Sequence, residues 1–401
     1  MLALALSLAL APTPTPQAAP LAAPLAMTTP LVPPQVPPQP APQPAVDASA
    51  SALEGLVAPG EPGLAVLVRK DGRTLVERSC GVRELRTRRP IDARTGFRLA
   101  SVTKQMTAAA VMLLVREGRL RYEDTLPQAL PGYSPYASAV TIRHLLTHTS
   151  GLPDYEQLMD EAEKQKGPRW SPTRQIRDDE VLALLLQAER LRFVPGSGWA
   201  YSNSGYVVLG LVVARAAGKP FGEVLRERIF APLGMSRTLA FDSSRNQVAD
   251  RAYGHTKEGR EFRETDQSPT SATLGDGGVY SCLEDLARWD EALRTNALLR
   301  AEEMALALTP ARLADGSEPR WPEEAGGDNL FPGRPVAYGF GWFVDPWRER
   351  PRAWHHGETL GFRSVIERFP GDGLTVIALA NRGDIDLRAL ALKLVDPLLP
   401  R

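Results

Sequence analysis

The sequence predicts an α+β fold: an antiparallel sheet flanked by helices, together with a mostly helical subdomain. Three observations support this prediction. A pair of strands is predicted near the start of the folded part, strand patterns return near its end, and helical patterns dominate the long stretch between them. Because short turns rather than helical crossovers join the strands, we expect antiparallel pairing, with the sheet assembled from both ends of the chain.

The first residues differ in composition from the rest of the chain. Residues 1–16 form a signal-like segment, because their apolar run suits the core of a signal peptide and is too short to cross a bilayer. Residues 17–49 are rich in proline and carry no charge before Asp47, so we expect a disordered linker there. Residues 50–401 are expected to form one domain. We expect a periplasmic or secreted protein without a stable membrane span.

The elements of this domain follow from residue patterns taken in order. Strands are predicted at 63–70 and 73–80 around Asp71-Gly72, a dipeptide typical of two-residue hairpin turns. A helix is predicted from Ser101 to Glu117, where apolar residues recur at helical spacing before Gly118. Further helices are predicted at 141–148, 178–190, 204–217, 283–294 and 385–399, and further strands at 337–344, 362–369 and 374–380.

Composition excludes several classes of function. Hydrophobic residues make up 43% of the 401 residues, enough for a substantial core. The 47 basic and 47 acidic residues cancel, so no basic face is expected and no nucleic-acid partner. Cys80 and Cys282 are expected to be two separate buried thiols rather than a disulfide framework. We find no phosphate-binding or dinucleotide-binding loop, and expect no cofactor and a monomer.

The first chemical motif is Ser101-Val102-Thr103-Lys104. A serine hydroxyl is a weak nucleophile until a base removes its proton, and residues three apart on a helix share one face. Lys104 can therefore reach back to Ser101 and activate it, provided that the amine is partly neutral. The alternative is a serine that caps a helix, followed by a solvated lysine, and this motif alone does not separate the two.

The second motif is Tyr201-Ser202-Asn203, which follows a loop rich in glycine and serine. A tyrosine serves as a base only when cations stabilise its phenolate, or it relays a proton held by a lysine. Asn203 offers a donor and an acceptor, which suit a substrate carbonyl and a lysine amine. By itself, such a tyrosine is more often a core or rim residue.

The third motif runs from His355 to Phe362 and contains Gly357, at the start of a predicted strand. A strand edge lined by glycine lets a substrate backbone approach and pair with it. An N–H group of that edge, together with that of Ser101, would form a two-donor oxyanion hole. The alternative is a glycine bulge that opens a core strand.

Together, these motifs resemble those of the serine β-lactamase and penicillin-binding protein superfamily, closest to class C β-lactamases and their esterase and peptidase relatives. Three further stretches resemble the same family, at 142–155, 229–235 and 275–289. The resemblance implies a β-lactamase/transpeptidase-like fold with the active site between the sheet and the helical subdomain. It implies catalytic roles for Ser101, Lys104 and Tyr201, and substrate-binding roles for Asn203, His355, Gly357 and Glu358.

One position departs from the family pattern. Class C β-lactamases usually have lysine where this chain has His355, and a histidine carries no permanent charge at neutral pH. If His355 contacts a substrate carboxylate as imidazolium, binding should weaken as the pH rises. We therefore expect a serine hydrolase acting on an ester or amide, such as a D-alanyl peptide, a small ester or a β-lactam.

The sequence also allows two other functions, a wall-peptide binding module and a zinc hydrolase. The chain could be a catalytically weak sensor or wall-peptide binding module, although such a protein has no reason to retain Ser101, Lys104 and Tyr201. His144 and His148 have a spacing that can bind zinc, but Leu145 stands where a metalloprotease needs glutamate. We expect structural hydrogen bonds from these histidines and no metal site.

Overall fold

The computed structural model describes residues 43–133, 135–324 and 330–399. The predicted signal-like segment and the predicted linker up to residue 42 lie outside these residues. The prediction of linker is wrong for residues 43–49, because helix α1 (Gln43–Ser51) begins there. From Ala45 to Ala58 the sequence has no proline and is rich in alanine, and Val46 packs against the core cluster of helix α11 (Leu387–Val395). The Oγ of Ser49 donates to the carbonyl of Leu394 at 2.7 Å.

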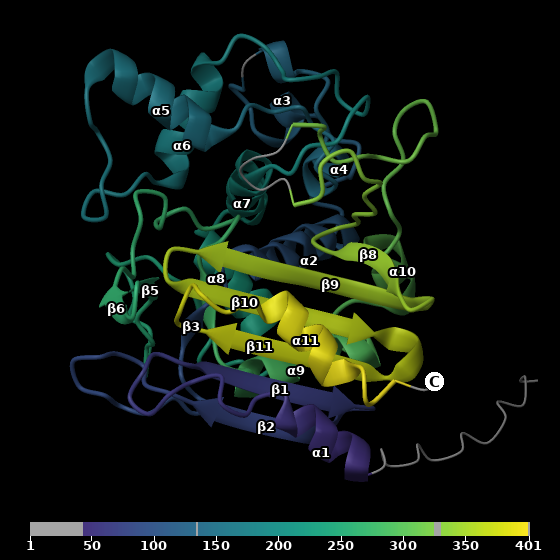
Figure 1. Ribbon diagram of the computed structural model, residues 1–401. Helices are drawn as coiled ribbons and strands as arrows, with labels where there is room; N and C mark the ends of the chain where they lie inside the picture. Colours follow the sequence, from purple (N-terminus) through teal and green to yellow (C-terminus); the bar gives the residue numbers. More distant parts are fainter. Residues whose placement is uncertain (1–42, 134, 325–329, 400–401) are drawn as a thin grey trace, which may run out of the picture. The chain divides into compact units, whose positions relative to one another are not determined.

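The central element is an antiparallel sheet (Figure 1). Its strands in the described residues are β1 (Leu64–Lys70), β2 (Arg73–Cys80), β8 (Phe343–Trp347), β9 (Arg350–Thr359), β10 (Phe362–Phe369) and β11 (Leu374–Ala380), in the order β2-β1-β11-β10-β9-β8. Strand β1 pairs with β11 along its whole length, from Leu64 opposite Ala380 to Lys70 opposite Leu374. The sheet is thus assembled from both ends of the chain, as predicted.

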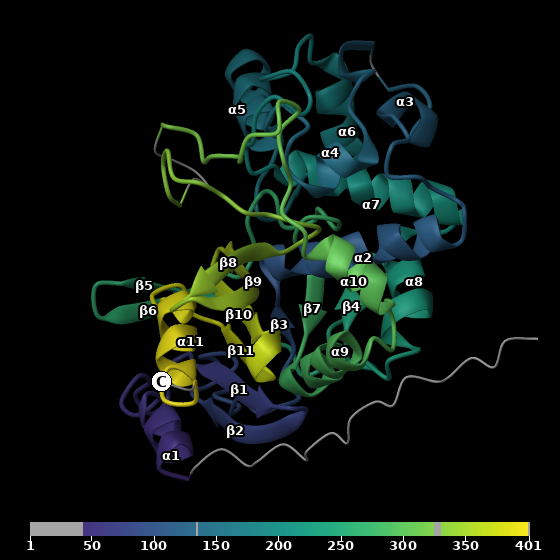
Figure 2. The same cartoon turned by 90° about the vertical axis from the view of Figure 1, so that its right-hand side faces the viewer.

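Helices cover both faces of this sheet (Figure 2). Alternate residues of a strand point to opposite faces, and β1 is apolar and buried on both. Val66 faces the cluster that contains α1 and α11, whereas Leu67 faces the larger cluster around α2 (Thr103–Arg116) and α9 (Leu283–Thr295). The sheet is therefore the middle layer of this part of the molecule.

A second group of helices lies beyond the β9 side of the sheet (Figure 1). It consists of α3 (Leu126–Ala129), α4 (Ile142–Leu146), α5 (Tyr155–Lys166), α6 (Asp178–Gln187) and α7 (Asn203–Ala217). The remaining helices are α8 (Phe221–Leu225) and α10 (Ala301–Ala307). In the described part of the chain, no helix has the length and apolar character needed to cross a membrane. The α+β class and the helical subdomain are confirmed.

Several predicted boundaries need correction. The strand predicted at 337–344 begins only at Phe343, and β9 begins at Arg350, in a stretch where Pro351 and two arginines conceal the strand pattern. Short strands also occur in the helical middle, where none was predicted: β3 (Phe97–Arg98), β4 (Leu239–Ala240), β5 (His255–Glu258), β6 (Glu261–Glu264) and β7 (Val279–Ser281). Cys80 and Cys282 are separate free thiols, as expected, but only Cys282 is buried, whereas Cys80 is half-buried.

Candidate active site

Ser101 lies on a tight turn just before α2. It is the middle residue of a single 3₁₀ turn, Ala100–Val102, and Ala100 has φ 45°, a conformation that residues other than glycine rarely adopt. Two neighbouring strands hold Leu99, the residue directly before this turn. The N–H of Leu99 donates to the carbonyl of Val279 at 2.9 Å, and the carbonyl of Leu99 accepts from the Oγ of Ser364 at 2.6 Å. The strained backbone is therefore fixed by β7 and β10.

Lys104 lies in the first turn of α2 and is fully buried. Its Nζ lies 2.9 Å from the Oγ of Ser101, 2.8 Å from the Oδ1 of Asn203 and 3.0 Å from the carbonyl oxygen of Asp276. The three-residue spacing brings serine and lysine together as the sequence predicted. The alternative of a solvated lysine after a helix cap is wrong.

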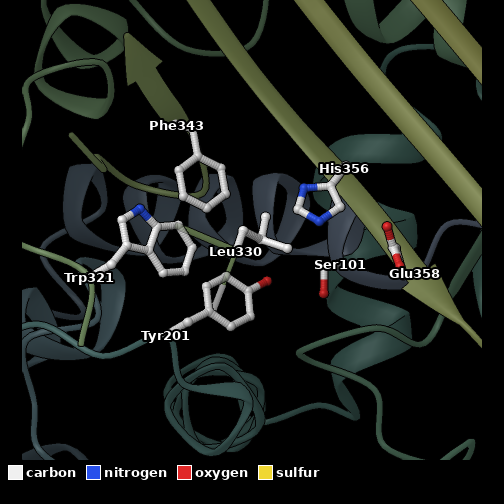
Figure 3. Close-up of a pocket in the computed structure, with 7 residues that line it drawn as sticks. All are labelled: Ser101, Tyr201, Trp321, Leu330, Phe343, His356 and Glu358. Carbon is white, nitrogen blue, oxygen red and sulfur yellow. The ribbon is translucent and has the colours of Figure 1, made fainter. Parts of the chain in front are cut away.

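Tyr201 and Asn203 approach this pair from the start of α7. Ser202 caps the helix, since its Oγ accepts from the N–H of Gly205 at 3.0 Å, and this turn directs Asn203 onto the lysine. The ring centre of Tyr201 lies 4.8 Å from the Nζ of Lys104. Figure 3 shows the Tyr201 hydroxyl on the side of the pocket where Ser101 lies. The second motif therefore joins the first at one site.

His148 belongs to this site, although the sequence did not reveal its role. Its carbonyl accepts from the N–H of Ala200 and its Nδ1 from the N–H of Ser202, both at 3.1 Å, so it holds the backbone on each side of Tyr201. Its ring lies 4.4 Å from the Tyr201 ring. Burial, then the charge of Lys104, holds the pKa of His148 well below its usual value, so the ring is neutral.

His144 has a different partner. The two histidines considered for zinc, His144 and His148, therefore each hold a different part of the backbone. The Nδ1 of His144 accepts from the N–H of Thr141 at 3.2 Å, and Thr141 caps α4 in return. The one sequence signal for His148 was its place in the stretch 142–155, which resembles the family. No local pattern connected His148 to Tyr201.

Gly357 brings β9 against the turn that carries Ser101. A Cβ at this position would lie 2.1 Å from the carbonyl oxygen of Leu99 and 2.9 Å from the amide nitrogen of Ser101, so only glycine fits. Glu358 follows, with its side chain 47% exposed beside the pocket. The alternative of a glycine bulge does not hold, because β9 and β10 stay in register through both residues.

The assignment of His355 to substrate binding is corrected. The residue is fully buried, its Nε2 lies 3.0 Å from the hydroxyl of Tyr338, and its Nδ1 lies 2.7 Å from the carbonyl oxygen of His356. Burial, then His356 and Lys104, holds the pKa of His355 well below its usual value, which is the opposite of an imidazolium. Strand alternation turns His355 inward with Gly357 and places His356 in the pocket instead.

These residues surround a cavity of about 80 Å³ (Figure 3). The described residues that line it are Ser101, Tyr201, Trp321, Leu330, Phe343, His356 and Glu358. They come from the turn before α2, the residues before α7, a loop after α10, and strands β8 and β9. The cavity thus lies where the sheet meets the helical subdomain.

Comparisons with known proteins identify the family of this chain. The sequence profile of a family described as Beta-lactamase matches residues 50–396. A penicillin-binding protein of Bacillus subtilis is 31% identical over 79% of this chain and 67% of its own length. Esterase EstB of Burkholderia gladioli is 32% identical over 71% of this chain and 82% of its own length.

A solved structure extends the likeness to three dimensions. It is described as the octameric penicillin-binding protein homologue from Pyrococcus abyssi, and it superimposes with a TM-score of 0.69 at 26% identity, over 87% of this chain and 75% of that one. The profile, the relatives and the fold give one answer. This chain belongs to the β-lactamase family, within the superfamily of serine β-lactamases and penicillin-binding proteins.

Proposed function

We propose that this protein hydrolyses an ester or amide through an acyl-enzyme formed on Ser101. The observation that carries the proposal is the 2.9 Å contact between the Nζ of Lys104 and the Oγ of Ser101, inside a buried site. A nucleophile within hydrogen-bonding distance of a base, with the base held by further groups, is the arrangement that acyl transfer requires. Asn203 and the carbonyl of Asp276 supply those further contacts.

The reaction would proceed in two steps. The Oγ of Ser101 attacks the substrate carbonyl while its proton passes to Lys104 or Tyr201, which we assign jointly as the base. The bond from the carbonyl carbon to the leaving group then breaks, and the leaving group takes up that proton. Water attacks the acyl-enzyme in the second step, releasing the acid and restoring the hydroxyl of Ser101.

The oxyanion would be held by two backbone N–H groups, those of Ser101 and Glu358. The close approach of Gly357 to the amide nitrogen of Ser101 supports this role, because it brings the two peptide groups to one point. In addition, β8 pairs with β9 only as far as Trp354, opposite Phe343, in the described residues. The edge beyond Trp354 is thus suited to pair with a substrate backbone.

A labelling experiment tests the proposal. A fluorescent fluorophosphonate or a fluorescent penicillin should label the wild-type protein covalently and leave Ser101→Ala unlabelled. The variant Ser79→Ala, on β2 at the far edge of the sheet, is the matched control and should label like wild type. Equal labelling of wild type and Ser101→Ala would refute the proposal.

The second candidate is a sensor that binds wall peptide without turnover. It would retain acylation by the penicillin probe, yet the acyl group would stay on Ser101. Rapid release of the label in a chase experiment, together with hydrolysis of any 4-nitrophenyl ester, favours the enzyme. A label that persists with no turnover of esters, peptides or β-lactams favours the sensor.

We also propose that the protein is exported and monomeric. The apolar run within residues 1–11 supports export. Fractionation of the producing cells should place the protein in the periplasm or medium, and retention in the cytoplasm would contradict export. Light scattering tests the monomer directly, a useful check because one solved relative is described as octameric.

A further inference from the structure

One side of the pocket is an aromatic wall. The rings of Trp321 and Phe343 stack 5.9 Å apart, and the ring of Tyr201 lies parallel to Phe343 at 6.5 Å. Trp354 stacks behind Phe343 at 4.7 Å. Trp321 and Phe343 are each only 4% exposed, so packing on their far side holds the wall in place. Such a surface stabilises a flat apolar group of a substrate by removing it from water.

Beside this wall lie His356 and Glu358, two residues apart on β9, and the His356 ring lies 6.4 Å from that of Phe343 and 5.6 Å from that of Trp354. Burial, and then the charges of Arg388 and Lys104, lower the pKa of His356 to about 3, so its imidazole is neutral at pH 7. Its Nδ1 is buried and has no hydrogen-bond partner in the described part of the chain. This part of the pocket therefore presents a neutral hydrogen-bonding group and one exposed carboxylate.

The cations near the pocket are already engaged. The Nζ of Lys104 lies within 3.0 Å of three oxygens that belong to the site itself. The Nη1 of Arg363 donates to the carbonyls of Thr359 and Phe362 at 3.0 and 2.8 Å, and its Nε lies 3.5 Å from Glu358. The described residues that line the cavity include no lysine or arginine. A substrate carboxylate would thus find no cationic partner there.

We propose that the pocket accepts uncharged esters or amides with an aromatic or bulky apolar group, and discriminates against substrates that carry a carboxylate beside the scissile bond. This inference rests on the acyl transfer proposed above and narrows its substrate class. Glu358 repels such a carboxylate, the neutral His356 adds no positive charge to attract it, and the aromatic wall offers it no polar contact. Peptides and β-lactams with a free carboxylate should therefore acylate Ser101, but more slowly than their uncharged counterparts.

Two compounds that differ only in the carboxylate test this inference. Phenylacetylglycyl-D-lactate ends in a carboxylate, and its C-terminal amide has the same shape without the charge. Each is used to protect Ser101 from the fluorophosphonate, and kcat/KM is measured by release of phenylacetylglycine. The amide should protect at a concentration at least tenfold lower and be cleaved with the higher kcat/KM.

Variants identify the residues responsible. Glu358→Gln should narrow the difference between the two compounds, and His356→Lys should reverse it in favour of the carboxylate. Glu77→Gln removes an exposed carboxylate from β2, at the opposite edge of the sheet, and should leave the ratio unchanged. Phe343→Leu should reduce the ratio of kcat/KM for 4-nitrophenyl phenylacetate to that for 4-nitrophenyl acetate. This ratio measures how much the aromatic wall contributes to binding.

The outcomes separate this inference from the function on which it rests. If the fluorophosphonate labels Ser101 but the carboxylate compound protects it equally well or better, or neither compound protects, the inference on substrate class is overturned while acyl transfer stands. If wild type and Ser101→Ala label alike, both are overturned.

Discussion

At the scale of single residues, the site depends on one buried amine. Lys104 contacts the nucleophile, an amide oxygen and a backbone carbonyl within 3.0 Å. Three elements far apart in sequence thus converge on one side chain. Its replacement should disable the proposed proton transfer from Ser101 without removing the fold around it, because most residues of α2 are buried and well packed.

Lys104→Ala should lower kcat/KM by about 10² to 10⁴, the usual contribution of a general base. Lys104→Arg should not restore activity, because a guanidinium keeps its proton at any working pH. The measurements are kcat/KM for a 4-nitrophenyl ester and the rate of fluorophosphonate labelling. Full activity of the arginine variant would show that the residue supplies charge rather than a base.

His148→Phe should leave the N–H of Ser202 without its buried acceptor, a loss of about 1–3 kcal/mol in the free energy of unfolding. Because the same contact positions Tyr201, kcat should fall more than KM changes. His148→Asn, which can keep an acceptor near Ser202, should recover part of kcat. Equal kcat in both variants would contradict a positioning role.

Because His355 is buried and neutral, we expect the free energy of unfolding to depend on its protonation at acidic pH. Its folded pKa lies well below the value near 6.5 of the unfolded chain, so below pH 6.5 only the unfolded state takes up its proton. Its favourable contribution is present above pH 6.5 and is lost as the pH falls toward the folded pKa. In His355→Gln, the free energy of unfolding should therefore fall less steeply near pH 5, by about 1.4 kcal/mol per pH unit. Parallel urea titrations of both proteins check this, and equal slopes would contradict it.

At the scale of elements, the contact between β9 and the turn of Ser101 decides the geometry. Gly357→Ala would force a Cβ onto the carbonyl of Leu99, at a distance of 2.1 Å, so backbone must move. A shift of about 1 Å at the oxyanion hole should cost about 10²-fold in kcat/KM. Gly371→Ala is the control, since nothing lies within 4 Å of its Cβ and activity should be unchanged. Wild-type activity in Gly357→Ala would refute the close contact.

Elements with a clear local pattern were predicted well. Strands β10 and β11 match their predicted bounds. Gly118 follows the end of α2 with positive φ, as expected from the sequence, and Gly218 ends α7 in the same way. Strand β9 was not predicted, because Pro351 and the arginines on either side of it are typical of loops. The serine and lysine could be paired from helical spacing alone. Whether His355 or His356 faces the pocket depends on which side of β9 meets the turn, and this is a tertiary fact.

The whole molecule shows why some residues of the site could not be found from sequence. Trp321 and Phe343 belong to no motif, yet they form the wall of the cavity because the loop after α10 and strand β8 fold over it. Contacts between segments this far apart follow from topology rather than local pattern. The sequence therefore predicts the cluster of Ser101, Lys104 and Tyr201 better than the aromatic wall beside it.

The place of β11 in the sheet has a consequence for the synthesis of the protein. Because β11 lies between β1 and β10, the first strand of the domain has no inner neighbour until the last strand has left the ribosome. Nascent chains stalled after residue 373, with a spacer that clears the exit tunnel, should not react with a fluorophosphonate, whereas chains stalled after residue 401 should. Labelling of the shorter chain would mean that Ser101 becomes reactive before β11 is added to the sheet.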